Sequence, residues 1–178
     1  MPSQGVPRED DYLPPAVLLY ERRGLWHLAL RTCWDEQFAP RGDVPSPAWI
    51  RFGRLSEMRT LASRRPGSFF VVEARSGWEP KVAQELTHLR RWHPHTKTAV
   101  VSQRAKDLEA FFREMGAAAV ADRVGRAGLL AAMIDSHFRS LPRELLDPWA
   151  LAWDGIPWRE FARGTPTDDI STPGNNQR

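Results

Sequence analysis

Short apolar runs alternate with amphipathic segments over most of this chain. Five runs have the length and composition of buried strands, and they span residues 16–20, 49–52, 68–74, 98–102 and 117–121. Elsewhere apolar residues recur three or four positions apart, which predicts helices over residues 25–34, 56–64, 80–93, 108–115 and 129–138. Strands that alternate with helices indicate a parallel sheet covered on both faces. The pattern therefore predicts a single doubly wound α/β domain.

Cap and turn residues support several of these boundaries. Ser56 can cap the second helix. Pro80 suits the first turn of the third helix, and the fourth helix ends at Gly116. Residues 49–52 form the weakest of the predicted strands, so we expect them at an edge of the sheet.

The two ends of the chain differ in composition from its centre. Residues 1–15 are polar and contain four prolines, which predicts a flexible arm in front of a domain of residues 16–141. Residues 142–163 are rich in tryptophan, and the polar residues 164–178 are expected to be disordered.

The tryptophan-rich segment is expected to be helical, with a start at Asp147-Pro148. It carries Trp149, Trp153 and Trp158, and tryptophan is enriched at the centres of protein interfaces. Two interpretations follow. The segment either folds back and covers one face of the domain, or it docks onto a protein partner or a second copy of the chain.

Charge and composition narrow the possible functions. The chain has 178 residues and a formal net charge of +3, with its basic residues spread rather than clustered, which argues against a nucleic-acid-binding surface. Cys33 is the one cysteine, so no intramolecular disulfide can form. No stretch approaches the ~20 apolar residues of a membrane span, and we expect a cytoplasmic protein. His93 and His95 have no acidic or cysteine partner nearby, so no metal site is predicted.

A glutamate, Glu73, stands at the end of the apolar run of residues 68–74. Open α/β sheets bind their ligands in a crevice at the carboxyl ends of the strands. A carboxylate at the end of a buried strand is therefore a candidate for chemistry.

The order and spacing of residues 16–140 resemble a receiver domain of the two-component response regulator family. The most telling stretches are residues 85–102 (ELTHLRRWHPHTKTAVVS) and residues 111–120 (FFREMGAAAV). The first is similar to the family's third helix, proline-containing turn and fourth strand. The second is similar to the segment where a helix ends in Gly-Ala before the fifth strand. The resemblance implies a flavodoxin-like sheet with the strand order 2-1-3-4-5, followed here by a C-terminal helical extension.

The resemblance also assigns roles to five residues. In receiver domains a pair of acids after the first strand helps to bind magnesium, and an aspartate at the end of the third strand accepts phosphate. A serine or threonine ends the fourth strand, and a lysine follows the fifth. The corresponding receiver-like pocket of this chain consists of Glu21, Arg22, Glu73, Ser102 and Arg123.

The substitutions in this pocket change its expected chemistry. Arg22 replaces an acid, and a guanidinium offers no lone pair to a magnesium ion, which prefers oxygen ligands. The side chain of Glu73 is one methylene longer than aspartate, and its carboxylate could pair with Arg22 or Arg123. Its permanent charge near Ser102 would partly imitate the phosphorylated state. We therefore predict no metal, no cofactor and no acyl phosphate at Glu73.

Three interpretations of the pocket stay open at this point. Its residues are polar strand ends without a present role, a fixed salt-bridge network that holds the loops, or a true ligand or catalytic site. Exposed ion pairs contribute only ~0–1 kcal/mol each, so stability does not decide among them.

The function favoured by the sequence is that of a phosphorylation-independent pseudo-receiver. It would be a non-enzymatic regulatory protein-interaction module in bacterial signal transduction. Its partner, or a second copy, would bind through the tryptophan-rich extension or through the face formed by the fourth helix, fifth strand and fifth helix, around residues 108–115 and 126–138. The alternative is a small-ligand-binding or enzymatic domain, with Glu21 and Glu73 as acid or base and Ser102 and Arg123 as anion contacts. A third reading, weak binding of nucleic acid, is less favoured.

Overall fold

The computed structural model describes residues 13–39 and 46–146. Five parallel strands form one sheet in the order β2-β1-β3-β4-β5, as predicted. The strands are β1 (Ala16–Tyr20), β2 (Ala48–Arg51), β3 (Phe69–Glu73), β4 (Lys97–Val101) and β5 (Ala119–Ala121). The weakly patterned β2 lies at an edge, and β1 and β3, which are buried except for Glu73, lie inside the sheet.

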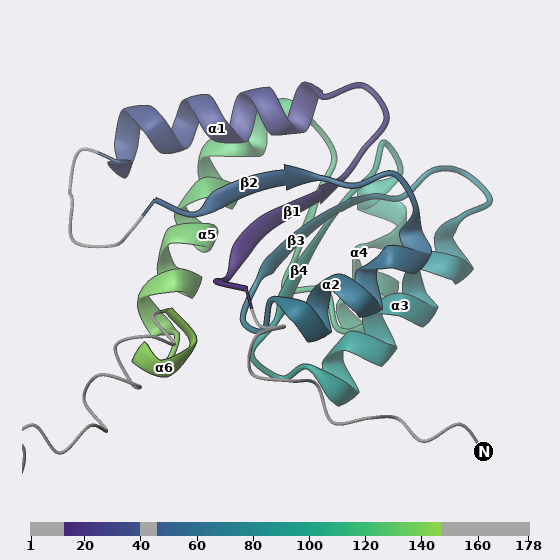
Figure 1. Cartoon of the computed structure of the whole chain (residues 1–178). Helices are drawn as coiled ribbons and strands as arrows, with labels where there is room; N and C mark the ends of the chain where they lie inside the picture. Colours follow the sequence, from purple (N-terminus) through teal and green to yellow (C-terminus); the bar gives the residue numbers. More distant parts are fainter. Residues whose placement is uncertain (1–12, 40–45, 147–178) are drawn as a thin grey trace, which may run out of the picture.

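Helices cover both faces of the sheet (Figure 1). On one face lie α1 (Leu25–Gln37) and α5 (Ala127–Ser140), and on the other lie α2 (Met58–Arg64), α3 (Glu79–Trp92) and α4 (Ala105–Met115). The remaining elements are the 3-10 turns η3 (Leu55–Glu57) and η4 (Val124–Arg126) and the single turn α6 (Arg143–Leu146). The two-sided cover is the doubly wound arrangement expected from the alternation of strands and helices.

The alternation of side chains along each strand builds two separate cores. Leu18 and Val72 belong to the cluster packed under α2, α3 and α4, whereas Leu19 and Val71 belong to the cluster packed under α1 and α5. Because successive residues of a strand point to opposite faces, strands buried on both faces must be apolar throughout. That requirement explains the uninterrupted apolar runs of the sequence.

Both ends of the described chain lie at the amino edge of the sheet. Leu13 donates its N–H to the carbonyl oxygen of Arg64 (2.7 Å), and Arg65 donates from Nη1 to the carbonyl oxygen of Pro14 (2.7 Å). On the α5 side, Leu141 and Leu145 pack against Gly67, whose φ of +76° also favours glycine.

The local predictions differ from the structure in two places. Ser56 does not cap α2, because it lies inside η3, and the helix begins at Met58 without a side-chain cap. The chain is already helical at α6, before the predicted start at Asp147. That start and the three tryptophans Trp149, Trp153 and Trp158 lie outside the described residues, as does most of the predicted arm. Within the described part of the chain, every helix is too short or too polar to cross a membrane.

Candidate functional site

The carboxyl edge of the sheet brings the ends of β1, β3, β4 and β5 together. Glu73 is the last residue of β3, Glu21 and Ser102 directly follow β1 and β4, and Arg123 lies two residues after β5. Since parallel strands end at the same edge, the predicted pocket residues all lie along it. Their side chains, however, have quite different surroundings.

Glu21 caps the first turn of α1. Its side chain is only 3% exposed, and its two carboxylate oxygens accept hydrogen bonds from the backbone N–H groups of Trp26 and His27, each at 2.9 Å. Gly24 occupies the N-cap position with φ +75° and has no side chain to offer. Glu21 therefore supplies the acceptors and the negative charge that the start of a helix favours.

A guanidinium completes the surroundings of Glu21. The Nε atom of Arg51, on β2, lies 3.7 Å from Oε1 of Glu21, and the guanidinium lies beside Gly24. The carboxylate is thus held by two amides and one cation. A metal ion would have to displace these partners before Glu21 could bind it.

Glu73 holds the loop that follows β1. Its Oε2 atom accepts a hydrogen bond from the backbone N–H of Arg22 at 2.8 Å and lies 3.5 Å from Nη2 of Arg75. The sequence suggested a pair with the guanidinium of Arg22 or Arg123. The structure instead pairs Glu73 with the backbone of Arg22, whose side chain is exposed. The carboxylate links the ends of β1 and β3.

Arg75 is the residue at this edge that the sequence did not single out. Its guanidinium carbon lies 6.0 Å from the ring centre of Tyr20 and 5.9 Å from that of Trp78, and these two rings lie 6.5 Å apart. Lys81 places its ammonium 5.0 Å from the Trp78 ring. Aromatic faces attract such cations. The arrangement keeps Arg75 beside Glu73, and a signal for it was available in the close spacing of Glu73, Arg75 and Trp78.

Ser102 is buried and serves the loop before α4. Its hydroxyl oxygen accepts the backbone N–H of Arg104 at 3.2 Å, and its carbonyl oxygen accepts that of Ala105 at 3.0 Å. Arg104 in turn lies 3.6 Å from Glu79, at the start of α3. Ser102 therefore takes part in the join between β4 and α4.

Arg123 is exposed and stands apart from the two carboxylates. Within the described residues, no ion pair joins it to Glu21 or Glu73. Its carbonyl oxygen accepts the N–H of Arg126, which also lies 3.1 Å from Asp122. Within the described residues, Glu21 and Glu73 each hold a loop through separate partners, and no ion pair joins either carboxylate to the Arg22 or Arg123 side chain.

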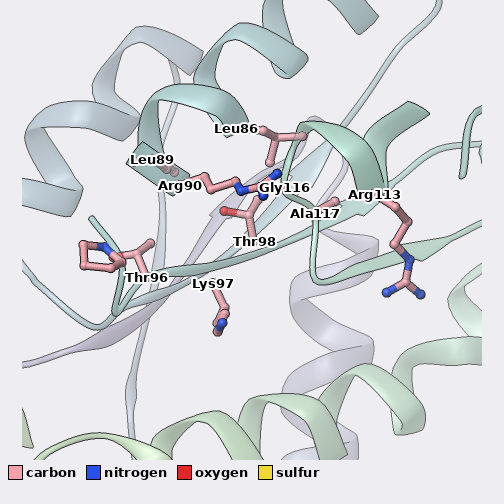
Figure 2. A pocket seen from close by; sticks show the side chains of 10 residues that line it. Leu86, Leu89, Arg90, Thr96, Lys97, Thr98, Arg113, Gly116 and Ala117 are labelled. Carbon is pink, nitrogen blue, oxygen red and sulfur yellow. The ribbon is translucent and has the colours of Figure 1, made fainter. Parts of the chain in front are cut away.

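A hollow of about 370 Å³ lies at the opposite edge of the sheet, between the ends of α3, β4 and α4 (Figure 2). Arg90 and Arg113 line it, and both donate to backbone carbonyl oxygens, of Glu114 (3.0 Å) and of Ala118 respectively. Thr96 also lines it, with a buried hydroxyl that has no partner. The two arginine side chains are thus already hydrogen-bonded to the backbone at and just after the end of α4.

A buried histidine side chain lies near this amino edge of the sheet. His137, on α5, places Nε2 2.8 Å from the carbonyl oxygen of Gly67. Burial lowers the pKa of His137, and the nearby charges of Lys97 and His95 lower it further, while the contact to Gly67 opposes them. The imidazole is therefore neutral near pH 7 and donates to Gly67. Within the described residues, no three His, Cys, Asp or Glu side chains gather as a metal site.

The chain matches no protein-family model and no curated protein. It is similar to a solved structure, the crystal structure of a response regulator from Thermotoga maritima. The two share 21% sequence identity with a TM-score of 0.55, over 72% of this chain and 100% of that chain. At this identity the likeness shows the fold alone. The chain has the receiver-like, flavodoxin-like fold that its element order predicted.

Proposed function

We propose that this chain is a regulatory protein-interaction module of receiver type that works without phosphorylation. The observation that carries the proposal is the state of the two edge carboxylates. Glu21 is held by two amides of α1 and by Arg51, and Glu73 is held by the amide of Arg22 and by Arg75. Groups that would have to bind magnesium and phosphate instead fix the loops of the protein itself.

Electrostatics supports the same conclusion. Transfer of a phosphoryl group to a carboxylate needs a cation that neutralises the charge of the phosphate, and Mg²⁺ prefers several oxygen ligands. Arg22 supplies a positive charge but no lone pair. The pair of Arg75 with Glu73 gives the loop after β3 a fixed charge arrangement that needs no modification. We infer that the surface is constitutively in one signalling state.

The output of such a module must be a binding surface. The helices on either side of the edge strand β5 both expose large apolar side chains, Phe111 of α4 at 37% and Leu129 of α5 at 62%. Exposed apolar groups beside polar ones mark many protein interaction sites. We propose this face, together with the tryptophan-rich segment, as the place where a protein partner or a second copy binds.

A rebuilt pocket provides the test. The triple variant Arg22→Asp, Glu73→Asp and Arg123→Lys places the side chains of a receiver domain at the same positions. Isothermal titration with Mg²⁺ and beryllofluoride should give no binding heat for the native chain and a measurable heat for the triple variant. A native chain that binds beryllofluoride in a Mg²⁺-dependent manner contradicts the proposal.

The interaction face is tested separately by charge substitution. Phe111→Asp and Leu129→Asp should each weaken self-association or partner binding, and Leu28→Asp serves as the matched control, because Leu28 is 67% exposed but lies on α1. Sedimentation velocity over a range of concentrations reports self-association. If the native chain self-associates and Leu28→Asp disrupts it more than the other two variants, the proposed face is wrong.

A second candidate function, the binding of a small ligand at the carboxyl edge, is supported by a separate observation. The Nε atom of Arg75 is buried without a hydrogen-bond partner beside the rings of Tyr20 and Trp78. A nucleotide, which joins a planar base to anionic phosphates, is the chemistry that a cation beside two aromatic rings would recognise. A thermal-shift series with nucleotides separates the two functions. A shift in the native chain that is lost in Trp78→Ala favours ligand binding.

A further inference from the structure

A groove runs along the outer face of α3, on the side of the sheet away from α1 and α5. Its volume is about 480 Å³. Arg59 of α2 lines one part of it, Met115 of α4 lines another, and the floor is α3 itself: Pro80, Ala83, Gln84, Thr87, His88, Arg91 and Trp92. In the part of the chain that the structure describes, the groove is lined by cationic, apolar and neutral polar side chains and by no carboxylate.

The end of this groove at the C-terminus of α3 carries an exposed aromatic residue. Trp92, the last residue of α3, is 61% exposed. The guanidinium carbon of Arg91 lies 5.1 Å from its ring centre, and the ring of His88 lies 6.5 Å from it. A large ring next to two basic side chains is suited to a segment that is both acidic and aromatic.

The charge around the groove points the same way. The sequence has no Asp or Glu from residue 58 to residue 72, or from residue 86 to residue 106. Glu85 already makes two hydrogen bonds to Arg59, at 2.8 and 3.0 Å. Basic residues at the ends of helices complement the helix dipole, which accounts for Arg64 and Arg90. It does not account for the absence of acids from the second half of α3.

The N-terminal arm joins the described part of the chain at the end of α2, the helix that packs beside α3. Leu13 and Pro14 are tied to the end of α2 by the hydrogen bonds to Arg64 and from Arg65, and α2 packs against α3. The residues just before this anchor are Glu9, Asp10, Asp11 and Tyr12, three carboxylates and one aromatic ring.

The docking segment is long enough to span most of the groove. Residues 9–12 span up to ~14 Å when extended. The stretch of α3 from Pro80 to Arg91 is ~17 Å long at 1.5 Å per residue. An arm anchored at the end of α2 also has a high effective concentration at the neighbouring helix α3.

We propose that residues 9–12 of the N-terminal arm dock in the groove on the outer face of α3, with their carboxylates near Arg91 and His88 and the Tyr12 ring near Trp92. A high salt concentration should release the docked segment, because salt screens exposed charges. This inference is independent of the proposed function, because it concerns neither the carboxyl edge nor the face around β5.

A zero-length cross-link in the full chain tests the proposal. Arg91→Lys places an amine in the groove, and carbodiimide joins an amine to a carboxylate in direct contact. Peptide mapping should find the amine at position 91 joined to Glu9, Asp10 or Asp11 in the monomer. The yield should fall at least five-fold between 50 mM and 1 M NaCl, because salt screens exposed charges.

Two matched variants make the result decisive. Arg23→Lys places an amine at an exposed position on the opposite edge and should give no cross-link to the arm. Glu9→Gln with Asp10→Asn and Asp11→Asn, added to Arg91→Lys, should abolish the product. The proposal is overturned if the amine at position 91 is cross-linked to Asp168 or Asp169, or if the cross-link joins two molecules. It is also overturned if the Arg23→Lys variant reacts equally with the arm, or if no cross-linked product forms.

Discussion

Removal of the Glu21 carboxylate tests whether it works as the cap of α1. Glu21→Ala removes both acceptors from the amides of Trp26 and His27 and leaves Arg51 without its partner. Hydrogen bonds to charged groups contribute roughly 1.5–3 kcal/mol each, and loss of an N-cap typically costs ~1 kcal/mol. After truncation, water can hydrogen-bond to the freed amides of the first turn, which offsets part of this loss. We therefore expect a decrease of about 2–3 kcal/mol in the free energy of unfolding.

The assay is urea unfolding followed by circular dichroism, with thermal unfolding as a second readout. For a domain of this size, ~1 kcal/mol corresponds to roughly 3–4 °C in the melting temperature, so Glu21→Ala should melt about 6–12 °C lower. Glu21→Gln keeps one acceptor oxygen but loses the charge, and it should show about half of the effect.

Glu109→Ala is the matched control for this prediction. Glu109 pairs with Arg113 one turn away, and both side chains are about half exposed. Such pairs contribute ~0.3–0.5 kcal/mol. If Glu21→Ala costs no more stability than Glu109→Ala, Glu21 is not a cap, and the argument that its lone pairs are already used is refuted.

Two further predictions concern the core and the second edge. Phe112→Ala should lower the free energy of unfolding by ~3–5 kcal/mol, because Phe112 is fully buried. Phe111→Ala, at the neighbouring position that is 37% exposed, should lower it by less than ~1 kcal/mol. Equal losses in urea unfolding would contradict the assigned faces of α4. Because the pKa of His137 is lowered in the folded state, the unfolded chain binds a proton more readily, and the stability contributed by the neutral imidazole should be lost as the pH falls below about 6.5. His137→Gln can still donate a hydrogen bond to Gly67, and it should lose less stability than the native chain between pH 7.5 and pH 5. An equal loss would show that other groups, such as the half-buried His93, dominate the pH dependence of stability.

The sheet could be predicted from the sequence because its determinants are local and repetitive. Runs such as residues 16–20 and 69–72 are buried on both faces, so they are apolar at every position. The strand order came from the resemblance to receiver domains. The cap of α2 was predicted wrongly, because Ser56 lies inside η3 and α2 begins at Met58 without a side-chain cap.

The arrangement at the carboxyl edge could be predicted only in part. The positions of Glu21, Glu73 and Ser102 follow from where their strands end. Their partners do not, because the amides of Trp26 and Arg22 are common to every residue type and leave no sequence signal. The direction of the exposed Arg22 and Arg123 side chains was likewise beyond a pattern-based prediction. The spacing of Glu73, Arg75 and Trp78 offered a signal for Arg75, but its second aromatic neighbour, Tyr20, comes from a distant segment.

The central claim is that the edge carboxylates hold loops and accept no phosphate. Intact-mass spectrometry after incubation of the native chain with Mg²⁺ and acetyl phosphate tests it most directly, with the triple variant Arg22→Asp, Glu73→Asp and Arg123→Lys treated in parallel. We expect an unchanged mass for the native chain. A stoichiometric adduct of one phosphoryl group, mapped to Glu73, would contradict it.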